Sequence, residues 1–238
     1  PMDRAARRKL GVVPQEIALY PLLTARENLT AFGALNGVTG RDLTARVGWS
    51  LAWAGLGDRA DEPTRQFSGG MKRRLNIACS VLHGPEVILL DEPTVGVDPQ
   101  SRHRIWEMLA ELRKGGASLL LTTHQLDEAE NVCDRIVIID HGKTIAAGTV
   151  PELLHETIGT VRRVVFTLDK PASDELRDRG FETGDGNTLS RQVTDIAVEL
   201  PALIDDVRKT GVAIRDIHIE SPSLQAVFIH LTGRELRE

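Results

Sequence analysis

The 238-residue sequence predicts an α/β protein, in which a parallel sheet with helical crossovers is followed by a small α+β domain. Short apolar runs typical of buried strands occur at Val87–Leu90, Ser118–Leu121 and Arg135–Ile139, and helical patterns separate them. From about Thr160 a second series of short strands and helices begins. Ligands of parallel sheets bind at the carboxyl ends of the strands, so the functional residues are expected there.

Helical signals dominate the part of the chain before the first apolar run. Thr24 is a suitable N-cap, and Glu27 three residues later completes a capping box for a helix that extends to about Asn36. A second helical segment covers about 42–54. Because residues 13–83 carry little strand signal, this stretch is expected to be a mostly helical insertion.

A longer helix is predicted after the first strand. Asp98 is its N-cap and Pro99 occupies its first position, where proline is favoured. Its apolar face is marked by residues at i, i+3, i+4 and i+7, namely Ile105, Met108, Leu109 and Leu112. Gly115 and Gly116 end it.

The second part of the chain has the order βαββαβ plus a final helix, which suggests a split βαβ domain. Strands are expected at 161–168 and 212–219, and a hairpin over 181–193 is expected to turn at Asp185-Gly186-Asn187. The helices are expected at 173–179, at 197–209 and from Ser223 onward. In the simplest arrangement the final helix packs on this extension.

Composition argues against several classes of protein. The chain has 29 basic and 34 acidic residues and a net charge of −5, so it lacks the basic surface of a nucleic-acid-binding protein. Its apolar runs are far shorter than the roughly 18 residues of a membrane-spanning helix. Only Cys79 and Cys133 are present, which supports neither a disulfide framework nor a zinc site, and a reducing, cytosolic setting is the default.

Two carboxylates, Asp91 and Glu92, directly follow the buried strand at Val87–Leu90. An unpaired charge is costly there. A Mg²⁺ ion bound to a nucleoside triphosphate would offset that cost, with the first carboxylate on the metal and the second polarising an attacking water. Taken alone, the pair could equally be a helix cap or a turn.

Three further features are individually weak. Ser68-Gly69-Gly70 precedes a helix, where free N–H groups favour an anion, although such a tripeptide is usually a flexible turn. Asp98 could be only a helix cap, and His124 only a hydrogen-bonded histidine at a strand end.

The order and spacing of these features resemble the ATP-binding subunits of ABC transporters, over residues 1 to about 155. The signature motif, Walker B motif, D-loop and switch histidine of that family are similar to Phe67–Leu75, Val87–Thr94, Gly96–Pro99 and Thr122–His124. The segment Val12–Glu16 is similar to its Q-loop. Met71 and Phe67 depart from the commoner glutamine and leucine, as in a subgroup of the family.

The resemblance implies a P-loop NTPase-type sheet in an ABC domain at 1–157, with a helical subdomain at about 16–84 and an accessory α+β domain at 160–238. It implies that ATP and Mg²⁺ are the bound groups. The site residues it implies are Glu92 as general base, Asp91 and Gln15 near Mg²⁺ and the attacking water, His124 on the γ-phosphate, Ser68, Gly69 and Gly70 on the ATP of the opposing subunit, and Asp98 in coupling the two sites.

The sequence contains no Gly-x-x-x-x-Gly-Lys-Ser/Thr loop. Gly142-Lys143-Thr144 does not qualify, because Val137 stands at the first glycine position and a strand-like segment follows, so a turn is expected there. We therefore expect the sequence to begin inside the domain and to lack its N-terminal part. The complete protein is expected to be an ATPase, and these residues alone are expected to be inactive.

The segments Gly148–Leu153 and Ser221–Gly233 resemble the ATPases of bacterial ABC-2-type exporters, including drug and sodium efflux systems. This implies a motor subunit that works as a homodimer or heterodimer, does not bind nucleic acid, and is held by a separate membrane permease at the inner, cytoplasmic face of the cell membrane. One alternative is a non-catalytic subunit that contributes only its signature face to a heterodimer. Another is an ABC ATPase that acts on DNA or ribosomes.

Overall fold

The computed structural model describes residues 3–159, 161–172, 174–184 and 187–233. The chain divides into two compact units, Pro1–His124 and Gln125–Glu238, and each is described by itself. The sequence predicts a domain boundary near residues 157–160, but the observed division lies earlier, after His124. The reason is that the segment from Gln125 to Thr157 packs with the helix near the end of the chain.

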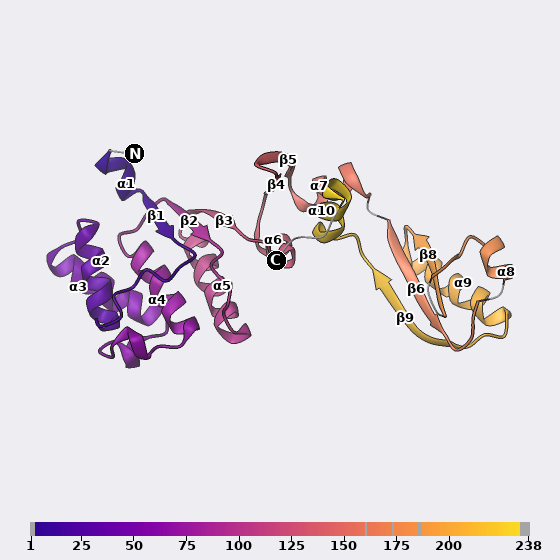
Figure 1. The fold of residues 1–238 in the computed structure, drawn as a ribbon, viewed down its shortest axis with the longest axis horizontal. Helices are drawn as coiled ribbons and strands as arrows, with labels where there is room; N and C mark the ends of the chain where they lie inside the picture. Colours follow the sequence, from indigo (N-terminus) through magenta and orange to yellow (C-terminus); the bar gives the residue numbers. More distant parts are fainter. Residues whose placement is uncertain (1–2, 160, 173, 185–186, 234–238) are drawn as a thin grey trace. The chain divides into compact units, whose positions relative to one another are not determined.

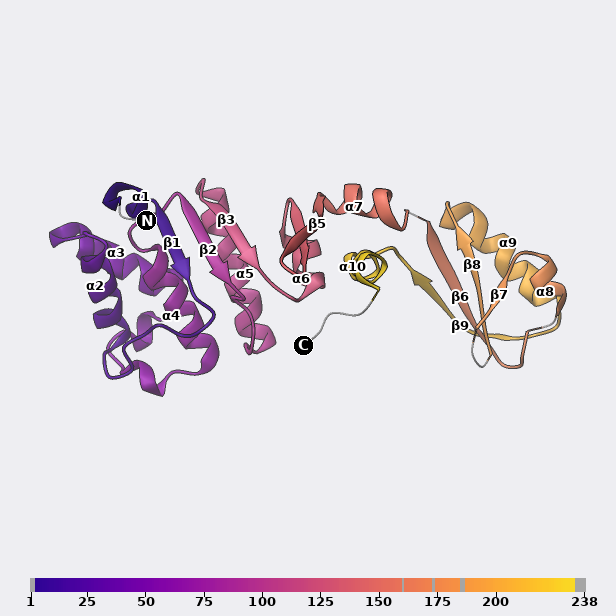
Figure 2. The ribbon, with the colours of Figure 1, turned by 45° about the horizontal axis from the view of Figure 1, so that its top comes forward.

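The first unit contains a parallel three-stranded sheet in the order β1-β2-β3. Its strands are β1 (Leu10–Val13), β2 (Val87–Asp91) and β3 (Ser118–Thr122), and Figure 2 shows their arrows pointing the same way. The last two confirm the predicted strands. The sequence does not predict β1, because four residues that include a glycine give a weak signal and only pairing with β2 defines the strand.

The helices of the first unit lie in the chain before β1 and between the strands (Figure 1). They are α1 (Arg4–Arg8), α2 (Ala25–Leu35), α3 (Gly40–Trp53), the 3₁₀ turns η1 (Gly57–Arg59) and η2 (Thr64–Gln66), α4 (Gly69–Val81) and α5 (Pro99–Lys114). Both bonds of the predicted capping box are present, since Thr24 accepts from the Glu27 amide and the Glu27 carboxylate accepts from the Thr24 amide.

The sheet is covered by helices on one face. Val13, Ile88 and Leu90 are buried in a core that also contains residues of α2, α3, α4 and α5. On the other face Val12 and Leu120 are half or more exposed. Residues that alternate along each strand therefore have opposite environments.

Asp98 caps α5, as predicted. Its carboxylate accepts a hydrogen bond of 2.9 Å from the Ser101 amide, and Pro99 is the first helical residue. The Ser101 amide and hydroxyl, in that order of importance, lower the pKa of Asp98 below its ordinary value.

In the second unit, the prediction that Arg135–Ile139 is a third parallel strand is wrong. The strand β4 (Ile136–Asp140) pairs antiparallel with β5 (Lys143–Gly148) in a separate two-stranded sheet. The reason is the two-residue turn at His141 and Gly142, where both φ angles are positive (47° and 73°). Such a turn suits a hairpin and is too short for the crossover that parallel strands require. Of the predicted turn Gly142-Lys143-Thr144 only Gly142 lies in the turn, because Lys143 and Thr144 already pair with β4 as the first residues of β5.

Among the described residues, the core around the final helix contains none of the α+β extension, contrary to the simplest expectation. Helix α10 (Leu224–Thr232) packs against α6 (Leu126–Val132) and α7 (Val150–Thr157), in a small core with Ala129, Ile138 and Leu153 (Figure 1). The Leu224 amide also donates to Glu130 Oε2 at 3.0 Å. The chain therefore returns to the segment that precedes the extension.

The extension has the predicted βαββαβ order. It consists of β6 (Arg162–Leu168), α8 (Asp174–Asp178), β7 (Glu182–Thr183), β8 (Thr188–Val193), α9 (Ile196–Lys209) and β9 (Ile214–Glu220). The sheet order is β7-β8-β6-β9 with every neighbour antiparallel, which is the split βαβ arrangement. Thr160, Ser173 and the Asp185-Gly186 part of the predicted turn lie outside the described residues.

We expect Ile88→Ala to lower the free energy of unfolding of the first unit by about 2–5 kcal/mol, because it leaves a cavity in the core. Leu120→Ala is the matched control, since Leu120 is on the neighbouring strand and 63% exposed, and its cost should stay below about 1 kcal/mol. Urea titrations followed by tryptophan fluorescence measure this unit, because all three tryptophans, Trp49, Trp53 and Trp106, belong to it. Equal costs would contradict the assignment of the buried face.

We also expect the charge of Asp98 to stabilise the first unit at neutral pH. A carboxyl whose pKa is lowered by folding contributes stability above its unfolded pKa and loses it as the pH falls through the folded value. The Asp98→Asn variant keeps the cap oxygen and removes the charge. The difference in unfolding free energy between wild type and variant should be present at pH 7 and shrink below about pH 4. A difference independent of pH would refute a contribution from the charge.

Candidate active site

Gln15, Glu92 and His124 meet at the carboxyl edge of the parallel sheet. They follow β1, β2 and β3, whose carboxyl ends lie at the same edge because the strands are parallel. Gln15 Nε2 donates to Glu92 Oε2 at 2.6 Å, and His124 Nδ1 lies 2.8 Å from Glu92 Oε1. Three residues widely separated in the sequence thus form one hydrogen-bonded cluster.

The backbone of Glu92 is strained. Its φ angle is +44°, in the left-handed region that non-glycine residues seldom adopt, at a typical cost of about 1–3 kcal/mol. Its amide donates to the Thr122 carbonyl at 3.1 Å, which ties the turn to β3. Its side chain is 21% exposed. This conformation directs the carboxylate toward Gln15 and His124 and leaves part of it open to solvent.

The bond to Glu92 determines which nitrogen of His124 carries a proton. An ionised carboxylate only accepts hydrogen bonds, so Nδ1 must be protonated when Glu92 is charged. The second nitrogen, Nε2, then remains for another group and can donate to a phosphate oxygen when the ring is doubly protonated.

Asp91 is the last residue of β2 and is exposed. Its Oδ1 accepts a bond of 2.5 Å from Thr122 Oγ1. Mg²⁺ prefers one or two carboxylates together with phosphate oxygens and water, and the exposed carboxylate of Asp91 fits that preference. Within the described ranges no group of three or more His, Cys, Asp or Glu side chains could hold a metal, so an ion here would need oxygen ligands from a nucleotide or water.

Ser68, Gly69 and Gly70 form the start of α4. Ser68 caps the helix, with Oγ accepting from the Met71 amide at 3.2 Å. A Cβ on Gly69 would meet open space, whereas a Cβ on Gly70 would lie 2.1 Å from Ser101 Oγ and 3.0 Å from Asp98 Oδ2. Gly70 is therefore required by its contact with the start of α5, and this contact places Asp98 beside the tripeptide.

Sequence reasoning missed Arg73, a buried residue on α4. Its Nη1 donates to the Pro14 carbonyl at 2.9 Å and its Nη2 to the Gln15 carbonyl at 2.5 Å. Asn76, one turn further along α4, is also buried, and its Oδ1 accepts from the Ala18 amide at 3.2 Å. Two polar residues three apart on the buried face of a helix were the signal available in the sequence.

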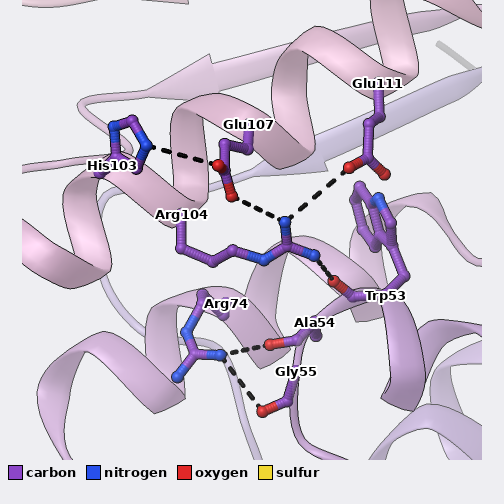
Figure 3. Close-up of polar contacts among 8 residues, drawn as sticks. All are labelled: Trp53, Ala54, Gly55, Arg74, His103, Arg104, Glu107 and Glu111. Carbon is purple, nitrogen blue, oxygen red and sulfur yellow. Dashed lines mark hydrogen bonds and ion pairs between the residues drawn. The ribbon is translucent and has the colours of Figure 1, made fainter.

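Two other arginines hold the end of α3, as Figure 3 shows. Arg74 of α4 donates to the Ala54 and Gly55 carbonyls, and Arg104 of α5 donates to the Trp53 carbonyl at 2.7 Å. Glu107 and Glu111 on α5 pair with Arg104. Positive charge at a helix C-terminus is favourable, so these contacts stabilise α3 and bind it to α4 and α5.

No helix among the residues that the structure describes is long and apolar enough to cross a membrane.

Over most of its length the chain is similar to known ATP-binding proteins. The ABC transporter family model matches residues 1–95. The linearmycin resistance ATP-binding protein LnrL of Bacillus subtilis (strain 168) is 36% identical, over 98% of this chain and 77% of that protein. The Nod factor export ATP-binding protein I of Ralstonia nicotianae is 40% identical, over 98% and 73%. The daunorubicin resistance ATP-binding protein DrrA3 of Streptomyces coeruleorubidus is 38% identical, over 98% and 75%.

Solved structures agree. An ATP-binding subunit of an ABC transporter has a TM-score of 0.58 and 32% identity, covering 64% of each chain. The cbiO1 protein of Clostridium perfringens, part of the ABC transporter complex cbiONQ, has a TM-score of 0.55 and 31% identity, covering 60% of this chain and 58% of that one. These matches confirm the P-loop NTPase-type fold. The chain belongs to the ATP-binding subunits of ABC transporters, and its resistance and export relatives agree with the predicted ABC-2-type exporter subgroup.

Proposed function

We propose that this chain is the ATP-hydrolysing subunit of an exporter and powers a separate membrane permease. The observation that carries the proposal is the hydrogen-bonded cluster of Gln15, Glu92 and His124 at the carboxyl edge of the parallel sheet. A nucleotide is expected at this edge in an α/β fold. The cluster combines a carboxylate, an imidazole and an amide, which are groups suited to orienting and deprotonating water.

Glu92 is the general base in this proposal. A carboxylate has about four acceptor positions, and Gln15 and His124 use two of them, so Glu92 can still accept a proton from water. As the water oxygen bonds to the γ-phosphorus, its proton passes to Glu92 and the bond to the ADP oxygen breaks. The fixed backbone of Glu92 keeps the base aligned, and His124 holds the γ-phosphate through Nε2.

Asp91 and Gln15 are the residues that would hold Mg²⁺. Thr122 Oγ1 orients the Asp91 carboxylate. The Gln15 side chain donates to Glu92 through its amide nitrogen, and its amide oxygen is the atom that would bind the metal. Bound Mg²⁺ would neutralise charge on the phosphate oxygens.

Ser68, Gly69 and Gly70 would bind the nucleotide held by a second ATPase subunit, in a homodimer or a heterodimer. They begin a helix of 13 residues, whose N-terminus favours phosphate. The open space beside Gly69 permits close approach of a ligand. Asp98, in contact with Gly70, would relay changes at this face to α5.

The permease and the export direction are supported by the relatives, two of which are named for resistance and one for Nod factor export. In this proposal the permease holds the subunit at the inner face of the cell membrane and selects the substrate. A non-catalytic subunit is the less favoured alternative, because it would have no need for the contacts of Glu92 with Gln15 and His124.

We expect Glu92→Gln to reduce ATP hydrolysis by about 10²–10⁴-fold in the natural gene product, because the amide cannot accept the water proton. ATP binding should persist, as measured by equilibrium titration with a fluorescent analogue. Glu86→Gln is the matched control, since Glu86 lies just before the amino end of β2 and its side chain is 66% exposed. Unchanged turnover in Glu92→Gln would remove Glu92 from this role and favour the non-catalytic alternative.

Asp91→Asn should raise the Mg²⁺ concentration needed for half-maximal hydrolysis, because an amide is a weaker ligand than a carboxylate. Turnover measured across a Mg²⁺ titration checks this expectation. A defect that is the same at every Mg²⁺ concentration would instead assign Asp91 a structural role through Thr122.

A further inference from the structure

Arg73 is a costly residue at its position. It is 5% exposed, and burial lowers the pKa of its guanidinium. In the part of the chain that the structure describes it forms no ion pair, and its buried Nε has no hydrogen-bond partner. An apolar side chain of similar size would often stabilise such a position as well or better. The stability of the fold therefore does not explain why a charged side chain occupies this position. The hydrogen bonds of the guanidinium explain it better.

Both contacts of Arg73 are with the loop that follows β1. The guanidinium donates through two different nitrogens to the consecutive carbonyls of Pro14 and Gln15. A planar guanidinium that binds two carbonyls fixes the orientation as well as the position of the peptide. That peptide carries the Gln15 side chain, whose amide donates to Glu92 at 2.6 Å.

Asn76 holds the same loop three residues further on, through the Ala18 amide. The loop is thus attached to α4 at both ends of the segment from Pro14 to Ala18. Because α4 begins at Gly69, directly after Ser68, one rigid helix carries both the tripeptide and the residues that hold the Gln15 loop.

We infer that Arg73 is a positioning residue, which sets the Gln15 amide against Glu92 and links the start of α4 to the hydrolytic cluster. The inference rests on the proposed function for its effect on turnover. The structural part of the inference is that Arg73 holds the loop at residues 14–18, and this part does not depend on catalysis.

A double-mutant cycle tests the effect on turnover, with kcat and KM for ATP measured in the natural gene product. Arg73→Met should lower kcat by about 10- to 100-fold, the usual effect of misplacing a reacting group by about 1 Å. In a Gln15→Ala background the same change should lower kcat by less than about twofold, because Arg73 acts through Gln15. Arg73→Lys, which keeps a donor, should recover part of the activity.

Arg41→Met is the control, because it makes the same substitution at an exposed position near the start of α3, outside the segment similar to the signature motif, and should leave kcat within about twofold. Additive losses in Arg73→Met and Gln15→Ala would overturn the inference, and so would a loss in Arg41→Met equal to that in Arg73→Met.

Amide hydrogen exchange separates failure of this inference from failure of the proposed function. Arg73→Met should speed exchange at the amides of 15–18 about tenfold or more and leave the β2 amides unchanged, whether or not ATP is hydrolysed. If wild type shows no hydrolysis but this local effect is present, the proposed function fails and the positioning contact stands. Unchanged exchange at 15–18, or equal acceleration throughout the first unit, would overturn the inference.

Discussion

The candidate active site depends on the register between three parallel strands. Val13 lies opposite Leu90, and Asp91 lies opposite Thr122. The three strands therefore end side by side, and the residues that follow them lie close together at the carboxyl edge of the sheet. Gln15, Glu92 and His124 come from sequence positions up to 109 residues apart, and only this pairing brings them within hydrogen-bond distance. A shift of one residue in register would turn each strand's side chains to the opposite face.

Buried polar side chains provide the second level of organisation. The segment between β1 and α2 has little regular structure, so its backbone groups need partners from elsewhere. Asn28, Thr64, Arg73 and Asn76 supply them, and all four are buried. Asn28, for example, accepts from the Tyr20 amide and donates to the Tyr20, Leu23 and Thr24 carbonyls. The loop that carries Gln15 is therefore held by specific contacts although it is irregular.

The second unit is organised by contacts between distant segments. Helix α10 leaves the split βαβ sheet after β9 and buries Leu224, Val227 and Phe228 against α6, α7 and β4. The sheet itself encloses a separate core that includes Phe166, Leu189 and Val207. Because α10 packs on the segment that precedes the extension, the extension is attached to that segment at both of its ends.

Local signals in the sequence are enough to predict most helices, their caps and the split βαβ order, because capping bonds and periodicity involve residues a few positions apart. They also identify Asp91, Glu92, His124, Ser68 and Asp98 as candidates, through motifs of fixed spacing. Pairing decides the rest. Formation of β1, the docking of α10 and the contacts of Arg73 require partners distant in sequence, which local propensity does not encode. The strand β4 differs, because its antiparallel partner β5 follows directly after a two-residue turn.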